Sequence, residues 1–167
     1  AALQLHYMGF IFFERSPRYA GDDFAVPHDF PDEVERVGVF VNERTEIIKG
    51  KALTTGIRCV QLHGSESVKD CGELKDAGYK VIKVFSVDDA FDFRTTKPYE
   101  AVADFFLFDT KGKYHGGNAM VFNWDALQRY DQRMPFFLSG GLSSENIREA
   151  EKLKGMNLHA LDVNSGV

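Results

Sequence analysis

The feature that most constrains the fold is a regular alternation of short apolar runs with helix-length segments. Largely apolar runs of this length are typical of strands buried on both faces, as in a parallel sheet. Because most of the runs are followed by a helical or helix-length segment, the pattern predicts an α/β fold with right-handed crossovers. The seven predicted strands cover residues 6–13, 37–41, 58–62, 80–87, 105–110, 136–138 and 159–163.

The segments between these strands carry helix signals of different strength. The first predicted helix begins near Thr45 and ends at Gly56, and the second begins near Ser65 and ends at Gly78. Two shorter helices are predicted over 124–130, capped by Asn123, and over 144–154, whereas prolines interrupt segments 21–36 and 88–103. The predicted apolar faces are Ile47, Ile48 and Leu53 in the first helix and Val68, Cys71 and Leu74 in the second.

An open doubly wound sheet and a (β/α)₈ barrel (a TIM barrel) both fit this alternation. Polar residues follow the predicted strands all along the chain, and the last two strands end in small residues with glycine, where barrels commonly hold phosphate. These observations favour the barrel. Because a closed barrel of this kind needs eight strands, we interpret residues 1–167 as one barrel domain truncated at both ends, with strands two to eight present and the first strand and final helix missing.

Composition excludes several classes of partner. The formal net charge is -5 and the lysines and arginines are scattered, which argues against a nucleic-acid surface. No apolar run approaches the roughly 18 to 20 residues of a membrane span. Cys59 and Cys71 are predicted to be reduced core residues, and no spacing of Cys and His suggests a metal. We therefore expect a cytoplasmic protein without nucleic-acid, membrane or metal partners.

One predicted strand ends in a chemically active group. Residues 105–110 read Phe-Phe-Leu-Phe-Asp-Thr, so Asp109 would lie at the carboxyl end of a buried strand. α/β folds gather their ligands and catalytic groups at that end of the sheet. Asp109 is therefore the leading catalytic candidate.

Several motifs, taken together and in their order, resemble the phosphoribosylanthranilate isomerase family of tryptophan biosynthesis. Each motif alone is weakly specific, but together they extend over nearly the whole chain. They are GFIFFERSPRY (9–19), RVGVFVNE (36–43), VQLHGSE (60–66), FLFDT (106–110), GGNAMVFNW (116–124), LSGGLSSENI (138–147) and LDVNSGV (161–167).

The resemblance implies an Amadori rearrangement that converts N-(5-phosphoribosyl)anthranilate to 1-(2-carboxyphenylamino)-1-deoxyribulose 5-phosphate. This chemistry needs a general acid at the ribose ring oxygen and a general base at C2 of the sugar. It implies no organic cofactor and no metal. The implied partner is the small phosphorylated sugar–anthranilate substrate, and the implied assembly is a monomer or homodimer.

The resemblance also implies roles for individual residues. Asp109 matches the general acid, and Arg18 matches the arginine that meets the anthranilate carboxylate, a task that suits the bidentate guanidinium. His63 and Asp162 could line the site or only brace it, so neither is placed in the catalytic set. The implied phosphate-binding residues are Gly140, Gly141, Ser165 and Gly166.

The sequence departs from the family pattern at two places. The family's general base is a cysteine in a first-strand Lys-Ile/Val-Cys-Gly motif that these residues lack, so the base is expected upstream of residue 1. The glycine loop carries Ala119 and Met120 where the family usually has glycine and lysine. The alternatives are another phosphate-binding barrel enzyme of tryptophan or histidine synthesis and an inactive, ligand-binding remnant.

Overall fold

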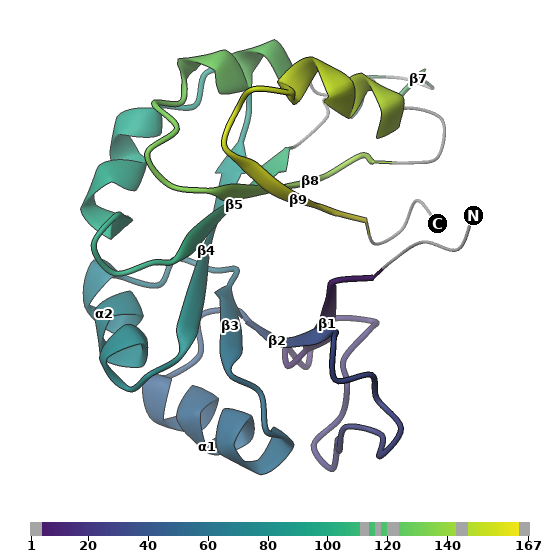
Figure 1. Cartoon of the computed structure of the whole chain (residues 1–167). Coiled ribbons are helices and arrows are strands. Elements are labelled where there is room, and N and C mark those ends of the chain that lie inside the picture. The colour runs from purple at the N-terminus through teal and green to yellow at the C-terminus, as the bar shows by residue number, and fades with distance from the viewer. Residues whose placement is uncertain (1–4, 111–113, 116–117, 120–123, 143–146, 164–167) are drawn as a thin grey trace. The chain divides into compact units, whose positions relative to one another are not determined.

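A computed structural model describes residues 5–110, 114–115, 118–119, 124–142 and 147–163. The chain forms two compact units. Unit 1 comprises Ala1–Lys83 and Ala101–Ala103, and unit 2 comprises Val84–Glu100 and Asp104–Val167. Strand β4 begins in unit 1 and ends in unit 2 (Figure 1).

The main sheet contains the seven strands that the sequence predicts, in the order β1-β2-β3-β4-β5-β8-β9. The pairs β1–β2, β2–β3, β3–β4, β5–β8 and β8–β9 are all parallel, which confirms the predicted α/β class. Parallel pairing puts the carboxyl ends of neighbouring strands at one edge of the sheet. The strands are β1 (Tyr7–Ile11), β2 (Glu35–Phe40), β3 (Cys59–Leu62), β4 (Lys80–Val87), β5 (Phe105–Thr110), β8 (Phe136–Ser139) and β9 (Leu158–Asp162). A separate antiparallel pair joins β6 (Tyr114–His115) to β7 (Asn118–Ala119).

In unit 1, helix α1 (Thr45–Thr55) has the predicted bounds but not the predicted apolar face. Gly56 ends it with a left-handed φ of 68°, as expected for a glycine stop. Ile48 is fully buried, but Ile47 and Leu53 are 44% and 81% exposed. The buried residues follow the i, i+3, i+7, i+10 spacing of one helix face, and they are Thr45, Ile48, Ala52 and Thr55.

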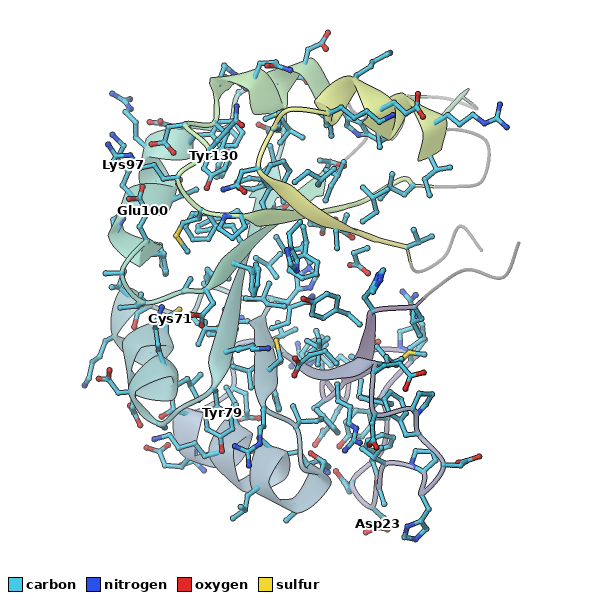
Figure 2. The ribbon with its side chains drawn as sticks, in the orientation of Figure 1. Asp23, Cys71, Tyr79, Lys97, Glu100 and Tyr130 are labelled. Carbon is cyan, nitrogen blue, oxygen red and sulfur yellow. The ribbon has the colours of Figure 1, made fainter. Side chains whose placement is uncertain are left out.

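Helix α2 (Val68–Asp76) starts about three positions later than the predicted start near Ser65. Ser67 caps it in a reciprocal capping box, in which the Ser67 hydroxyl accepts from the Asp70 amide and the Asp70 carboxylate accepts from the Ser67 amide. Glu66 lies outside the helix, and its side chain is buried. Cys71 and Leu74 are the buried face, and Figure 2 shows Cys71 between α2 and the strands.

In unit 2 the segments between strands form 3₁₀ helices, namely η1 (Phe93–Tyr99), η2 (Trp124–Arg129) and η3 (Ile147–Leu153). The two short predicted helices are thus helical but tighter than α-helices. Pro98 lies inside η1, in the segment where the sequence predicts an interruption. The predicted cap at Asn123 and the predicted start at 144 lie outside the described residues.

Aromatic side chains fill the space between η2 and the sheet of unit 2. Tyr130, just after η2, meets Phe108 at a ring-centroid distance of 4.9 Å and Phe136 at 5.8 Å. Phe106 and Phe108 therefore face η2, and both are fully buried. Since successive side chains of a strand alternate between faces, Asp109 faces the other side of the sheet.

Candidate active site

In unit 2, three polar side chains stand in one row at the carboxyl ends of adjacent strands. The strand register sets Asp109 of β5 opposite Ser139 of β8, and Ser139 opposite Asp162 of β9. Register partners in a parallel sheet lie on the same face. Asp109 is half-buried. The predicted placement of Asp109 at a strand's carboxyl end is confirmed.

The turn after β8 needs two glycines for different reasons. Gly140 has a φ of +94°, and a Cβ there would stand 2.1 Å from the Thr110 carbonyl oxygen, so no side chain fits. Gly141 has a φ of +67°, and a Cβ there would meet nothing within 4 Å. Gly140 is thus required by close packing against β5. Gly141 leaves open space into which an anion could approach its backbone.

Thr110 fixes this turn onto β5. Its buried hydroxyl lies 2.9 Å from the Ser139 carbonyl oxygen and 3.1 Å from that of Gly140. Asp109, the acid candidate, and Thr110, which holds the glycine turn, are therefore adjacent residues of β5. The other two predicted phosphate-binding residues, Ser165 and Gly166, lie outside the described residues.

Arg18 belongs to unit 1, in the loop that follows β1. Its side chain is exposed, and its backbone amide donates to the Ser16 hydroxyl at 3.2 Å. The loop is closed by the Ala20 amide, which donates to the Ile11 carbonyl at 2.9 Å. The loop therefore returns to β1 with a defined backbone, although its arginine is exposed to solvent.

A second set of contacts ties the far end of the same loop to helix α1. The Lys51 ammonium donates to the Asp22 carbonyl oxygen at 2.5 Å and lies 5.2 Å from the centre of the Phe12 ring. The Tyr19 hydroxyl donates to the Asp22 carboxylate, and this hydrogen bond raises the pKa of Tyr19 to about 12. The loop that carries Arg18 is thus braced by a helix of its own unit.

His63 stands just after β3, at the same edge of unit 1. Its backbone amide donates to the Phe40 carbonyl at 2.8 Å, and its Nδ1 lies 3.2 Å from the Gln61 amide nitrogen. An amide nitrogen can only donate, so Nδ1 accepts. His63 and Gln61 share one face, opposite to the face of Leu62.

Both cysteines of the chain are removed from solvent. Cys59 lies on β3 and Cys71 on α2, and each is fully buried. Burial raises the pKa of the Cys71 thiol to about 11. Because the thiolate is the reactive form, neither cysteine is placed to act as a base. This agrees with their predicted role as core residues.

Sequence reasoning missed a buried ionic cluster in unit 1. Lys83 and Glu66 form an ion pair at 2.9 Å with side chains only 3% and 2% exposed. The signal was available, because Lys83 interrupts the apolar run of residues 80–87 and Glu66 follows the His63-Gly64 pair.

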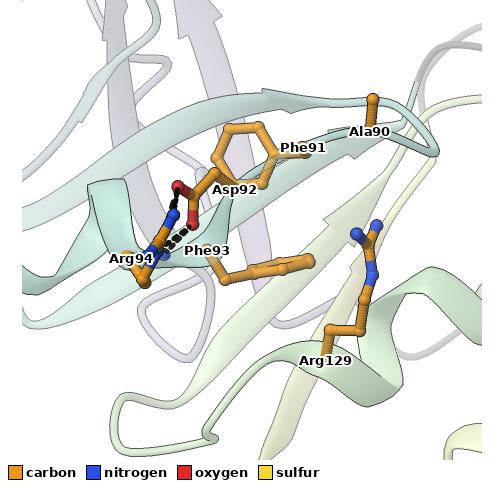
Figure 3. A pocket seen from close by; sticks show the side chains of 6 residues that line it. All are labelled: Ala90, Phe91, Asp92, Phe93, Arg94 and Arg129. Atoms are coloured by element: carbon orange, nitrogen blue, oxygen red, sulfur yellow. Dashed lines mark hydrogen bonds and ion pairs between the residues drawn. The ribbon is translucent and has the colours of Figure 1, made fainter.

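A shallow pocket of about 380 Å³ lies in unit 2 beside the loop after β4, and Figure 3 shows its lining. Arg94 makes paired hydrogen bonds to Asp92, which lower the pKa of that carboxyl group to about 2. Arg129 donates to the Asp89 carbonyl oxygen at 2.8 Å. Both guanidinium groups thus already have acceptors, and the pocket includes none of the predicted site residues. Its lining is Ala90, Phe91, Asp92, Phe93, Arg94 and Arg129.

Metal-ligating side chains do not cluster in the described part of the chain. Among those residues, no three His, Cys, Asp or Glu side chains gather closely enough to hold a metal ion. None of the helices described there combines the length and the apolar character that a membrane crossing requires.

Comparison with known proteins decides the family. The model of the N-(5'-phosphoribosyl)anthranilate (PRA) isomerase family matches residues 1–167. The chain belongs to the PRA isomerase family. It is therefore an isomerase of tryptophan biosynthesis, as the sequence motifs imply.

Individual relatives agree with this assignment. The PRA isomerase of Phocaeicola vulgatus is 43% identical over 160 residues, which cover 96% of this chain and 77% of that protein. The crystal structure of the enzyme from Thermotoga maritima is 33% identical, with a TM-score of 0.80 over 97% of this chain and 78% of that one. A PRA isomerase crystallised with reduced 1-(o-carboxyphenylamino)-1-deoxyribulose 5-phosphate is 32% identical, with a TM-score of 0.77 and coverage of 97% and 77%. The predicted barrel class is confirmed by these PRA isomerase structures.

Proposed function

We propose that the protein converts N-(5-phosphoribosyl)anthranilate to 1-(2-carboxyphenylamino)-1-deoxyribulose 5-phosphate. The observation that carries the proposal is the match of the family model to all 167 residues. The row Asp109–Ser139–Asp162 beside the Gly140–Gly141 turn supports it, because an acid and an anion-binding turn then lie at the same sheet edge. A relative was crystallised with a reduced form of this product.

Asp109 is proposed as the general acid. It protonates the ribose ring oxygen as the C1–oxygen bond breaks, and the aniline nitrogen supplies the electrons that form the C1 Schiff base. A base then removes the C2 proton, and the resulting enolamine tautomerises to the ketone. Oxidation at C2 balances reduction at C1, so the isomerisation needs no external hydride. A half-buried carboxyl group at a strand end is a suitable donor for the first step.

The phosphate is proposed to bind at Gly140, Gly141, Ser165 and Gly166. The open side of Gly141 supports this, because backbone amides can approach an oxyanion closely where no Cβ intervenes. Gly140 would contribute by holding the turn against Thr110. The phosphate would thus fix the sugar near the row that contains Asp109.

Arg18 is proposed to bind the anthranilate carboxylate. An exposed guanidinium on a braced loop supports this, since its planar donors match the two carboxylate oxygens. The substrate carries a carboxylate and a phosphate, and binding each of these anionic groups would reduce the freedom of the reacting sugar.

The general base is proposed to be a cysteine outside these 167 residues, as the family motif implies. Burial of Cys59 and Cys71 supports a base from elsewhere. The assembly is proposed to be a monomer or homodimer.

Purified protein that carries this chain should convert N-(5-phosphoribosyl)anthranilate to the aminoketose and should restore growth without tryptophan to bacteria that lack the isomerase. Turnover of a different phosphorylated sugar, with this substrate untouched, would favour another phosphate-binding barrel enzyme. Binding of a product analogue without any turnover would favour the inactive remnant.

A further inference from the structure

The ion pair between Lys83 and Glu66 lies on the helix-covered face of unit 1. The register sets Phe40 beside Leu62 and Leu62 beside Lys83, so these three side chains share a face. Figure 1 shows α1 and α2 on one side of β2 and β3. Lys83 and Glu66 both interact electrostatically with Cys71 of α2, so the pair lies on that side. Cys71 of α2 is buried there as well. A lysine and a glutamate have thus been taken out of water in the layer between helices and sheet.

Both charged groups are fully engaged by hydrogen bonds. The Lys83 ammonium donates to the Leu62 carbonyl at 3.2 Å, to the Gly64 carbonyl at 2.7 Å and to Glu66 Oε2 at 2.9 Å. An ammonium has three donors, and all three have acceptors. Glu66 Oε1 accepts from the Asn42 amide at 2.8 Å and from the Gly64 amide at 3.0 Å.

Apart from the bond between Lys83 and Glu66 themselves, these bonds all go to backbone groups. They hold the turns after β2 and β3, at Asn42 and at His63–Gly64. Asn42 Oδ1 in turn accepts from the Ser65 amide at 2.6 Å. A Cβ on Gly64 would lie 2.4 Å from Asn42 Oδ1 and 2.7 Å from the Asn42 amide nitrogen. The two turns are therefore packed directly against each other.

Stability alone is a poor explanation for such a pair. Desolvation of two buried charges offsets much or all of their attraction, and replacing both partners with well-packed hydrophobic side chains of similar size is often neutral. Lys83 lies in the middle of β4, but its ammonium binds the Leu62 and Gly64 carbonyls at the carboxyl end of β3, and barrels place their functional groups at that end of the strands. His63, whose backbone the pair fixes through Gly64, projects from the opposite face beside Gln61.

We propose that Glu66 and Lys83 are positioning residues for the isomerisation, which hold the turns after β2 and β3 so that this edge of unit 1 fits the substrate. The inference rests on the proposed function. The pair does not touch the substrate, because it lies on the helix side of the sheet. It acts through the backbone of Asn42, His63 and Gly64.

The test separates positioning from stability with a double variant. Glu66→Gln with Lys83→Met removes both charges, while the carbonyl oxygen of the new side-chain amide can still accept from the Asn42 and Gly64 amides. The matched control is Glu73→Gln with Lys49→Met, which removes a pair on α1 and α2 whose side chains are 38% and 32% exposed. Unfolding is measured together with kcat and KM for N-(5-phosphoribosyl)anthranilate, at a temperature where each variant is folded.

The buried double variant should recover most of the stability that Glu66→Gln and Lys83→Met each lose on their own, yet its kcat/KM should remain at least about tenfold below that of the wild type. The control should stay within about twofold. If the buried double variant is folded and has wild-type kcat/KM, the pair is merely structural and the inference is wrong. An inactive wild-type protein would instead overturn the proposed function, and the inference with it.

Gly64→Ala provides an independent arm that leaves both charges in place. Its Cβ would push the turn away from Asn42, so kcat/KM should fall at least about tenfold in a folded protein. Gly50→Ala on α1 is the control, because a Cβ there meets nothing within 4 Å. Wild-type kcat/KM in folded Gly64→Ala would show that the geometry of these turns does not matter. This arm decides the question if the double variant fails to fold.

Discussion

The two glycines after β8 show how neighbouring residues of one type can serve different ends. Position 140 has no room for a side chain because Thr110 lies against it. Position 141 has room for a side chain and favours glycine only because of its left-handed φ. The sequence marks both as phosphate-binding candidates and cannot separate them, because the separation depends on what lies across from each backbone. The motif therefore locates this turn, but only the packing against β5 distinguishes the role of Gly140 from that of Gly141.

The alanine variants of the two glycines should accordingly differ in how they affect stability and substrate binding. Gly140→Ala should destabilise the protein by several kcal/mol or displace the turn, because a 2.1 Å approach cannot be relieved against a backbone carbonyl. Gly141→Ala should cost about 1–2 kcal/mol for its left-handed φ and should raise KM for the phosphorylated substrate. Chemical unfolding and steady-state kinetics measure both. Equal loss of stability in the two variants would contradict this account.

Arg18 is the second residue for which a kinetic test is decisive. Arg18→Ala should raise KM strongly while the free energy of unfolding changes by less than about 0.5 kcal/mol, because an exposed side chain is removed. Arg15→Ala, also exposed and in the same loop, is the matched control and should leave KM unchanged. Unchanged kinetics in Arg18→Ala, or an equal effect of both substitutions, would count against its proposed role.

At the scale of elements, strand positions were read from the sequence more reliably than helix faces. Residues 80–87 and 105–110 are strands with the predicted bounds, because a continuous apolar run has few alternatives to burial. Ile47 and Leu53 were assigned to the wrong side of α1, since Thr45, Ala52 and Thr55 are small enough to lie against the sheet in their place. The buried Lys83–Glu66 pair was missed because Lys83 lies on β4 and Glu66 in the loop before α2, 17 residues away in the sequence.

Helix α2 depends on its capping box. Ser67→Ala should lower the free energy of unfolding by about 1 kcal/mol at neutral pH. Hydrogen bonds from Ser67 lower the pKa of Asp70, so this contribution is present above the ordinary Asp pKa and is lost as pH falls below it. The difference between variant and wild type should therefore shrink below about pH 4. Ser65→Ala is the control, and an equal loss there would contradict the cap.

Tyr130 links η2 to the aromatic layer and makes unit 2 sensitive to alkali. Its hydroxyl donates to the Met134 carbonyl at 2.9 Å and accepts from the Met134 amide at 3.0 Å. Burial raises the pKa of Tyr130 from 10.0 to about 12. The folded state thus holds the proton longer than the unfolded state, so stability falls as pH rises above about 10.

Tyr130→Phe should lower the free energy of unfolding by about 1–2 kcal/mol at neutral pH, because two hydrogen bonds are lost while the ring contacts remain. Between about pH 10 and 12 its stability should fall less steeply than that of the wild type. Denaturant unfolding across this pH range measures both effects. Parallel curves for the two proteins would show that Tyr130 does not titrate as described.

At the scale of the whole molecule, the sequence supplied the fold class and the family, because motifs in order along the chain are specific even where each is weak. It also supplied the residues of the proposed chemistry, and Asp109 does lie at the end of β5. It did not supply the supporting contacts, such as Thr110 against the glycine turn or Lys51 against the Arg18 loop. Those contacts join residues far apart in the chain, so no local sequence pattern predicts them.

The most direct test of the account is the turnover of N-(5-phosphoribosyl)anthranilate by the Asp109→Asn variant of the protein that carries this chain. Its kcat should fall by on the order of 10²–10⁴, while a product analogue binds nearly as tightly as to the wild type. Asp104→Asn, just before β5, is the control and should keep its activity. Retention of near wild-type kcat by Asp109→Asn would contradict the central claim that this carboxyl group is the general acid.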